Sequence, residues 1–158
     1  MPKSVSSIRL TIYFAVFLSS LVLISQAAVA SDLERLGVGT KNGRRDFLVE
    51  VVDTPKAREI GLMYRKNLPA KQGMLFVYPR EQRIRFWMRN TPISLDMIFF
   101  SADGIVRYIF HDAEPYSLTS VGPEVPVRFV LEINGGLSKQ HGIQVGDRVD
   151  HDLIEKNP

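Results

Sequence analysis

Short apolar runs separated by turn-forming residues predict a domain rich in β-strands. The runs lie at residues 47–52, 74–78, 84–88, 96–100, 105–110 and 127–133. In residues 84–88 and 127–133 apolar and polar side chains alternate, which is typical of strands with one buried face. The Asp-Gly pair at residues 103–104 stands between two runs and favours a hairpin there.

Two short helices complete the predicted fold. Thr54 is suited to accept a backbone N–H as an N-cap, and Pro55 suits the first helical position. A second helical turn is predicted at residues 137–141, after the irregular, proline-rich segment 111–126. Because strands outnumber helices and hairpin-type turns dominate, the expected fold class is α+β: a mostly antiparallel curved β-sheet or half-barrel with one or two short helices.

The first 30 residues have the pattern of a secretory signal peptide. Lys3 and Arg9 precede an apolar stretch, and Ala28 and Ala30 supply the small residues that a signal peptidase admits. We expect export, to the periplasm or the exterior, with cleavage near Ala30. The alternative is an uncleaved anchor, since residues 10–30 have nearly the roughly 20 residues that a bilayer crossing needs. In that case this segment would be the only membrane contact.

The rest of the chain is predicted to form one domain. Residues 31–45 are polar and contain three glycines, which indicates a flexible leader with room for a short strand, and residues 151–158 form a polar tail. Residues 46–150 hold the apolar runs of a single globular domain. Removing residues 1–30 leaves 128 of the 158 residues, enough for one core. The chain has no cysteine, so stability has to come from apolar packing rather than from disulfides.

Charge and motif content argue against several function classes. The chain has 20 basic and 17 acidic side chains, and two of the basic ones belong to the leader, which leaves a net charge of +1 and predicts no nucleic-acid partner. No nucleotide-binding or nucleophile motif is present. His111, Asp112 and Glu114 are close in sequence and are candidate metal ligands, but they include only one histidine, which argues against a metal site. We therefore expect no metal or other cofactor, and the pattern does not decide whether the protein is an enzyme.

Several ordered motifs stand out between Phe47 and Val149. They include Gly-Leu-Met-Tyr-Arg at residues 61–65, Gly-Met-Leu-Phe-Val-Tyr at 73–78 and Phe-Trp-Met-Arg-Asn-Thr-Pro-Ile-Ser-Leu-Asp at 86–96. Shorter ones follow at residues 113–115, 130–132, 142–143 and 146–149. In this order they resemble the family named domain of unknown function 192 (DUF192). The resemblance implies a small, mostly β domain, often exported, with no established activity to transfer.

The segment around Trp87 is the leading candidate for a ligand site. If the alternating apolar residues of 84–88 face the core, then Arg85, Trp87 and Arg89 share the opposite face. An indole beside two guanidinium groups suits a planar or anionic ligand, which would stack on the ring and accept hydrogen bonds from the arginines. The structural alternative is that Trp87 covers a second core and the arginines are solvated.

Asn90, Asp96 and Glu114 extend the candidate set. Asn90 suits a turn, and Asp96 either fixes the loop of residues 91–95 or faces the cleft beside Trp87 as a ligand acceptor. Our leading hypothesis is a non-catalytic domain of the cell envelope that binds a small ligand or a protein partner. The alternative is a hydrolase of an envelope polymer that uses Asp96 and Glu114 as an acid–base pair. A third class is a purely structural protein.

Overall fold

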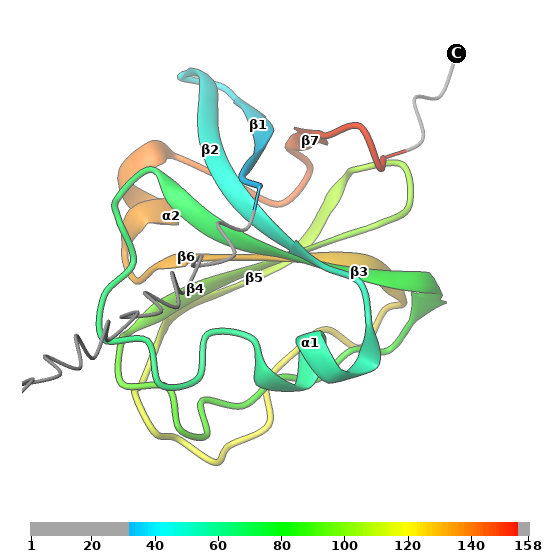
Figure 1. Ribbon diagram of the computed structural model, residues 1–158. Helices are drawn as coiled ribbons and strands as arrows, with labels where there is room; N and C mark the ends of the chain where they lie inside the picture. The colour runs from blue at the N-terminus through cyan, green and yellow to red at the C-terminus, as the bar shows by residue number, and fades with distance from the viewer. Residues whose placement is uncertain (1–31, 155–158) are drawn as a thin grey trace, which may run out of the picture. The chain divides into compact units, whose positions relative to one another are not determined.

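The structure, a computed structural model, describes residues 32–154. Within them seven strands form one curled sheet in the order β5-β4-β6-β3-β2-β1-β7, accompanied by two short helices (Figure 1). The helices are α1 (Pro55–Ile60) and α2 (Leu137–His141). The strands are β1 (Glu34–Thr40), β2 (Gly43–Val52), β3 (Gln72–Gln82), β4 (Leu95–Phe100), β5 (Val106–Ala113), β6 (Val127–Asn134) and β7 (Arg148–Asp150). The predicted α+β half-barrel is confirmed, whereas the predicted signal peptide lies outside the described residues.

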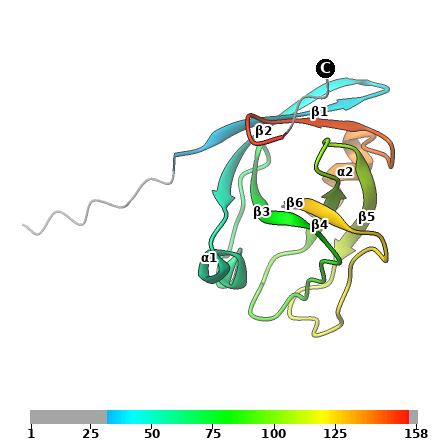
Figure 2. The same ribbon diagram turned by 90° about the vertical axis from the view of Figure 1, so that its right-hand side faces the viewer.

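The sheet is mixed and curls until its edges meet at one end. Neighbouring strands pair antiparallel except β2 and β3, which are parallel and are linked by the crossover that contains α1. Ile105 forms a bridge with Arg148, and the Val149 N–H donates to the Gly104 carbonyl at 2.7 Å, which brings β7 against the start of β5. Figure 2 shows the curl, with β1, β2 and β7 on one side and β3, β4 and β6 on the other.

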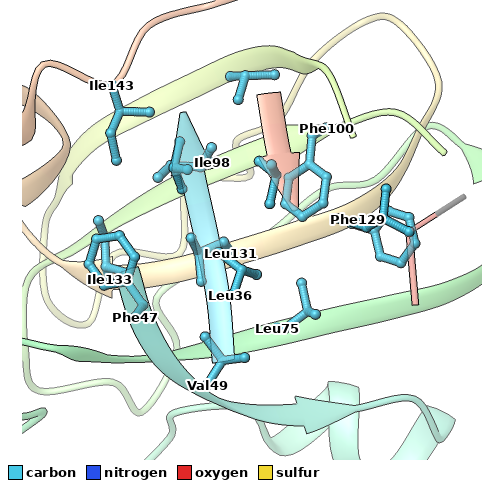
Figure 3. Close-up of a cluster of buried hydrophobic side chains, with 14 residues drawn as sticks. Leu36, Phe47, Val49, Leu75, Ile98, Phe100, Phe129, Leu131, Ile133 and Ile143 are labelled. Atoms are coloured by element: carbon cyan, nitrogen blue, oxygen red, sulfur yellow. The ribbon is translucent and has the colours of Figure 1, made fainter. Parts of the chain in front are cut away.

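Side chains on the two faces of the sheet form two apolar cores. The inner core lies within the curl, where opposing side chains point toward one another, among them Phe47, Leu75, Ile98 and Leu131 (Figure 3). The outer core uses the alternate residues of the same strands and is covered by side chains from irregular segments, including Leu62, Leu68, Ile84 and Met88. All six residues of β4 are buried because this strand contributes to both cores.

The local signals predicted around α1 and the hairpin are confirmed. The Thr54 side chain accepts a hydrogen bond of 3.2 Å from the backbone N–H three residues later, and Pro55 occupies the start of the helix. The helix ends at Gly61, whose φ is 47°. In the turn between β4 and β5, the Gly104 N–H donates to the Ser101 carbonyl at 2.9 Å.

Both ends of the domain belong to the sheet or the core, which differs from the sequence prediction. Residues 34–40, expected within a flexible leader, form β1 and pair with β2 across a tight turn. Leu36 and Val38 hold this strand in place because they are fully buried in the inner core. In the segment expected to be a polar tail, His151 is buried and Ile154 packs into the inner core.

The segment that begins at Ile84 keeps the predicted facing but is not a regular strand. Its residues make an isolated bridge, Phe86 with Val121, instead of a continuous ladder. Ile84 and Met88 are nonetheless buried, and Trp87 is exposed. The alternation persists because an extended backbone turns successive side chains to opposite sides, whether or not it pairs.

Candidate functional site

Strand β6 places a carboxyl group in the apolar outer face of the sheet. Residues of this strand alternate, so that Leu131 belongs to the inner core and Val130 to the outer one. Glu132 shares the outer face with Val130, as the sequence pattern predicts. Its register partners are Met74 on β3 and Met97 on β4, both buried. A side chain that is only 4 % exposed therefore carries a titratable group between two methionines.

Glu132 lines a cleft of about 340 Å³, which we name the α1 cleft. Its wall is formed by α1, the turn that follows it, β3 and the segment 85–91. Its lining combines apolar and aromatic side chains with a comparable share of polar groups. Besides Glu132, the lining residues are Pro55, Arg58, Glu59, Ile60, Gly61, Leu62, Met63, Phe76, Tyr78, Arg85, Phe86, Trp87 and Thr91.

The Glu132 carboxyl makes no hydrogen bond or ion pair with another group among residues 32–154. Within these residues, Arg45 Nε is the one fully enclosed side-chain nitrogen or oxygen without a partner, so the Glu132 oxygens reach the cleft surface. Burial raises its pKa from 4.5 to about 8, because the charged form loses its hydration. At neutral pH the group is therefore mostly protonated, with an O–H donor and a carbonyl acceptor. Buried polar groups are normally satisfied, so a free carboxyl in a cleft wall indicates a place for a ligand.

Arg58 and Tyr78 form one corner of the cleft. The Arg58 guanidinium lies over the Tyr78 ring, 4.7 Å from its centroid. It donates to the Val77 carbonyl at 2.8 Å and also to the carbonyl of Asp53, which fixes its position. Burial raises the pKa of Tyr78, so the phenol keeps its proton at neutral pH. The corner thus presents a positive charge and a neutral hydroxyl.

Trp87 is brought to the cleft by the extended segment after β3. Its side chain is 47 % exposed and lines the cleft together with Arg85. The Arg85 guanidinium donates to the Gly122 carbonyl at 3.0 Å and pairs with Glu124. Arg89 does not line the cleft, and its guanidinium lies 5.4 Å from the Trp87 ring centroid. Arg85 and Trp87 therefore both line the cleft, as predicted, and Arg89 lies beside the Trp87 ring outside the lining.

Asn90 holds the segment at the mouth of the cleft rather than facing it. Its carbonyl accepts from the Tyr64 N–H at 2.7 Å, and its side-chain amide donates to the Tyr64 hydroxyl at 2.9 Å. Asn90, Tyr64 and Tyr116 all have left-handed backbones, with φ of 57°, 64° and 62°. Such conformations cost about 1–3 kcal/mol in non-glycine residues and gather at functional sites. The loops bordering the cleft are held in a strained arrangement.

Asp96 lies elsewhere, buried at the junction of β4, β5 and α2. Its carboxylate accepts from the backbone N–H groups of Asp112, Gly136 and Ser138 at 2.7–3.0 Å, and from the Ser138 hydroxyl at 2.6 Å. It therefore fixes the start of α2 and the end of β5, not the loop of residues 91–95. Because its acceptors are used by these four donors and it does not line the α1 cleft, we assign it a structural role.

Glu114 is exposed in a second, smaller cavity that Asp96 does not line. The acid–base pair considered for a hydrolase therefore does not share either of these cavities. Nearby, the His111 Nδ1 is 2.7 Å from the Ser138 hydroxyl, and Lys139 donates to Asp112 at 2.9 Å. Residues 32–154 contain no group of three or more histidines and carboxylates placed to hold a metal. None of the helices in these residues is long and apolar enough to cross a membrane.

Of the residues that line the α1 cleft, only Arg85 and Trp87 belong to the predicted set; Arg58, Tyr78 and Glu132 are among those that the sequence did not single out. A signal for Glu132 is present in the sequence, because it is the one acidic residue of this strand and follows Arg128 and Val130 on its second face. Arg58 and Tyr78 give no such signal. They reach the cleft only through the parallel pairing of β2 with β3, which the sequence pattern does not reveal.

Two crystal structures of bacterial proteins share the fold of this chain. A protein from Sinorhizobium meliloti 1021, whose name proposes a transcription regulator, is 38% identical with a TM-score of 0.75, over 77% of this chain and 95% of its own. A protein of unknown function from Novosphingobium aromaticivorans DSM 12444 is 40% identical with a TM-score of 0.72, over 73% of this chain and 83% of its own. No protein with a curated description matches the chain.

A family model matches residues 38–151, a range that includes every residue lining the α1 cleft. This match confirms the resemblance seen in the ordered sequence motifs. The chain belongs to the DUF192 family, described as "Uncharacterized ACR, COG1430".

Proposed function

We propose that this protein binds a small ligand in the α1 cleft, as a binding domain rather than an enzyme. The observation that carries the proposal is the Glu132 carboxyl, which is buried, lines the cleft and has no partner among residues 32–154. A buried polar group without a hydrogen bond destabilises the folded state. A ligand that hydrogen-bonds to Glu132 would remove this penalty, so the site favours occupation.

Trp87 supplies the second part of the proposed site. Its half-exposed ring lines the cleft, with Phe86 and Tyr78 also in the wall. An exposed indole beside a polar anchor provides a stacking surface for a planar ligand. The ligand would thus be fixed at two points, by hydrogen bonds at Glu132 and by ring contact at Trp87.

A ligand screen with two matched variants tests this function. We expect at least one probe from a panel of aromatic acids, aromatic amines and monosaccharides to raise the melting temperature of the wild-type chain. Trp87→Ala should weaken that probe about 5- to 10-fold, the loss expected from about 1–1.4 kcal/mol of aromatic contact. Leu118→Ala is the control, because Leu118 is 68% exposed and lies outside the α1 cleft. A wild type that no probe stabilises, or equal binding by Trp87→Ala, would contradict the proposal.

We also propose that the protein acts outside the cytoplasm, because residues 1–30 have the composition of a secretory signal. The ligand would then be a component of the cell envelope or of the surrounding medium. A regulator role, as in the name of the Sinorhizobium meliloti protein, is not transferred, since a net charge of +1 after residue 30 does not favour nucleic-acid binding.

The export proposal predicts the amino terminus of the mature protein. Cell fractionation followed by mass spectrometry should find a chain that begins near Ser31 in the periplasmic or extracellular fraction. A full-length chain that starts at Met1 in the cytoplasmic fraction would contradict it.

A further inference from the structure

Hydrogen-bond donors dominate the polar lining of the α1 cleft. Four side chains contribute guanidinium, phenol or indole donors: Arg58, Tyr78, Arg85 and Trp87. Glu59 is a second carboxyl of the lining, and it is exposed to solvent. A ligand group that only accepts hydrogen bonds matches such a lining, whereas a group that only donates would find few partners.

The charges around the cleft leave one cation unbalanced. Arg85 is paired with Glu124. Arg58 makes no ion pair with a carboxylate among residues 32–154 and is held by backbone carbonyls instead. The charge of Glu59, the exposed carboxyl of the lining, is screened by solvent. The arrangement therefore complements a ligand with a single negative charge.

Glu132 adds a donor at the buried end of the cleft. Because burial raises its pKa to about 8, the carboxyl is mostly protonated at pH 7. A protonated carboxyl donates a short, charge-assisted hydrogen bond to a carboxylate, which is about twice as strong as a bond between neutral groups. Two carboxyl groups in a dry site share one proton in the same way.

We propose, building on the ligand-binding function above, that the α1 cleft takes a monocarboxylate with a planar, apolar body. The ligand carboxylate accepts hydrogen bonds from the Glu132 carboxyl and the Arg58 guanidinium, and the body stacks on Trp87. An ammonium ligand fits this corner less well. The Arg58 guanidinium lies over the Tyr78 ring, 4.7 Å from its centroid, and repels a second cation there.

Glu132 is the group expected to control the pH dependence of binding. The charged and titratable groups that line the cleft with it are Arg58 and Glu59 from α1, Tyr78 from β3 and Arg85 from the segment after β3, while β4 places Met97 opposite it in register. Glu50 lies beyond Met74 and is paired with Arg65. Arginines stay charged, and burial raises the pKa of Tyr78 further above neutrality. Ionisation of Glu132 would then remove the donor and place two negative charges together.

The experiment uses Trp87, the single tryptophan of the chain, as a fluorescent reporter at the cleft. Three probes with the same ring but different charge are titrated into the purified full chain: benzoate, benzyl alcohol and benzyltrimethylammonium. We expect benzoate to bind most tightly and its affinity to fall about tenfold between pH 7 and pH 9, as a group with a pKa of about 8 ionises. Glu132→Gln should remove this pH dependence, and the control Glu114→Gln should keep it, because Glu114 is exposed and lies outside the α1 cleft.

Each other outcome overturns the carboxylate assignment. Tighter binding of benzyltrimethylammonium that improves with pH would make the cleft a cation site. Equal binding of benzyl alcohol and benzoate would remove carboxylate recognition. If the benzoate affinity of Glu132→Gln still depends on pH, a group other than Glu132 controls the pH dependence. All three results leave the cleft as a ligand site, whereas failure of the broader probe panel and of Trp87→Ala would reject the binding function itself.

Discussion

Replacing Asp96 with alanine is expected to lower the free energy of unfolding by about 3–5 kcal/mol, which would unfold much of the protein near its working temperature. The Asp96 carboxylate is fully buried and accepts three backbone N–H groups and the Ser138 hydroxyl. Alanine would leave the three backbone N–H groups in a closed interior without an acceptor, whereas the Ser138 hydroxyl keeps the His111 Nδ1 at 2.7 Å. Each unsatisfied donor carries a desolvation penalty, so the loss exceeds that of an ordinary surface contact.

Urea denaturation followed by circular dichroism measures this loss. Asp150→Ala is the matched control, because the Asp150 carboxylate likewise accepts a hydrogen bond, from Arg44 at 3.0 Å, but is about half exposed. Exposed pairs contribute about 0–1 kcal/mol, so the control should remain close to wild type. If Asp96→Ala and Asp150→Ala lose the same small amount, the four hydrogen bonds at Asp96 do not hold α2 and β5 together.

Features fixed by neighbouring residues were predicted well from the sequence. The N-cap at Thr54 and the turn at Gly104 need only a few consecutive residues, and both occur where the pattern places them. The alternation that buries Ile84 and exposes Trp87 is also local, because an extended chain turns successive side chains to opposite sides. These signals depend on backbone preference alone.

Features that depend on distant pairing were not predicted. β1 reads as a polar leader because its second partner strand, β7, lies far along the chain, where Val149 pairs with Val38. The parallel pairing of β2 with β3 is equally hidden, since both strands look like members of an antiparallel meander. Residue Ile154 reads as part of a tail until the interior that it fills is known.

The candidate site divides in the same way. Arg85 and Trp87 were predicted because the alternation of one segment places them on one face. Arg58 and Glu132 join them from α1 and β6, elements that the sequence pattern gives no reason to bring together. Asp96 and Glu114 were chosen by residue type, and the structure places them outside the α1 cleft. Residue chemistry alone does not locate a site that several elements build.

Glu132→Met is expected to stabilise the protein at pH 8.5 by up to about 4–5 kcal/mol, an unusually large gain for one substitution. The ordinary pKa of a glutamate is 4.5, and burial raises that of Glu132 to about 8 in the folded protein. Below pH 4.5 the carboxyl is protonated in both states and the shift has no effect. Between pH 4.5 and pH 8 only the unfolded state releases the proton, so stability falls by about 1.4 kcal/mol per pH unit. Above pH 8 the penalty is complete.

Methionine at position 132 would join Met74 and Met97 in one apolar row and end this penalty. The gain over wild type, measured by urea denaturation from pH 4 to pH 9, should therefore be small at the acidic end and rise until pH 8. A gain that stays constant with pH would mean that burial does not hold the carboxyl protonated. Glu59→Met is the control, because this exposed side chain should show no comparable rise. The Glu132→Met protein should also lose benzoate binding. A purely structural residue cannot be replaced with both a gain in stability and a loss of ligand binding. A binding residue that is retained although it destabilises the fold must show both effects.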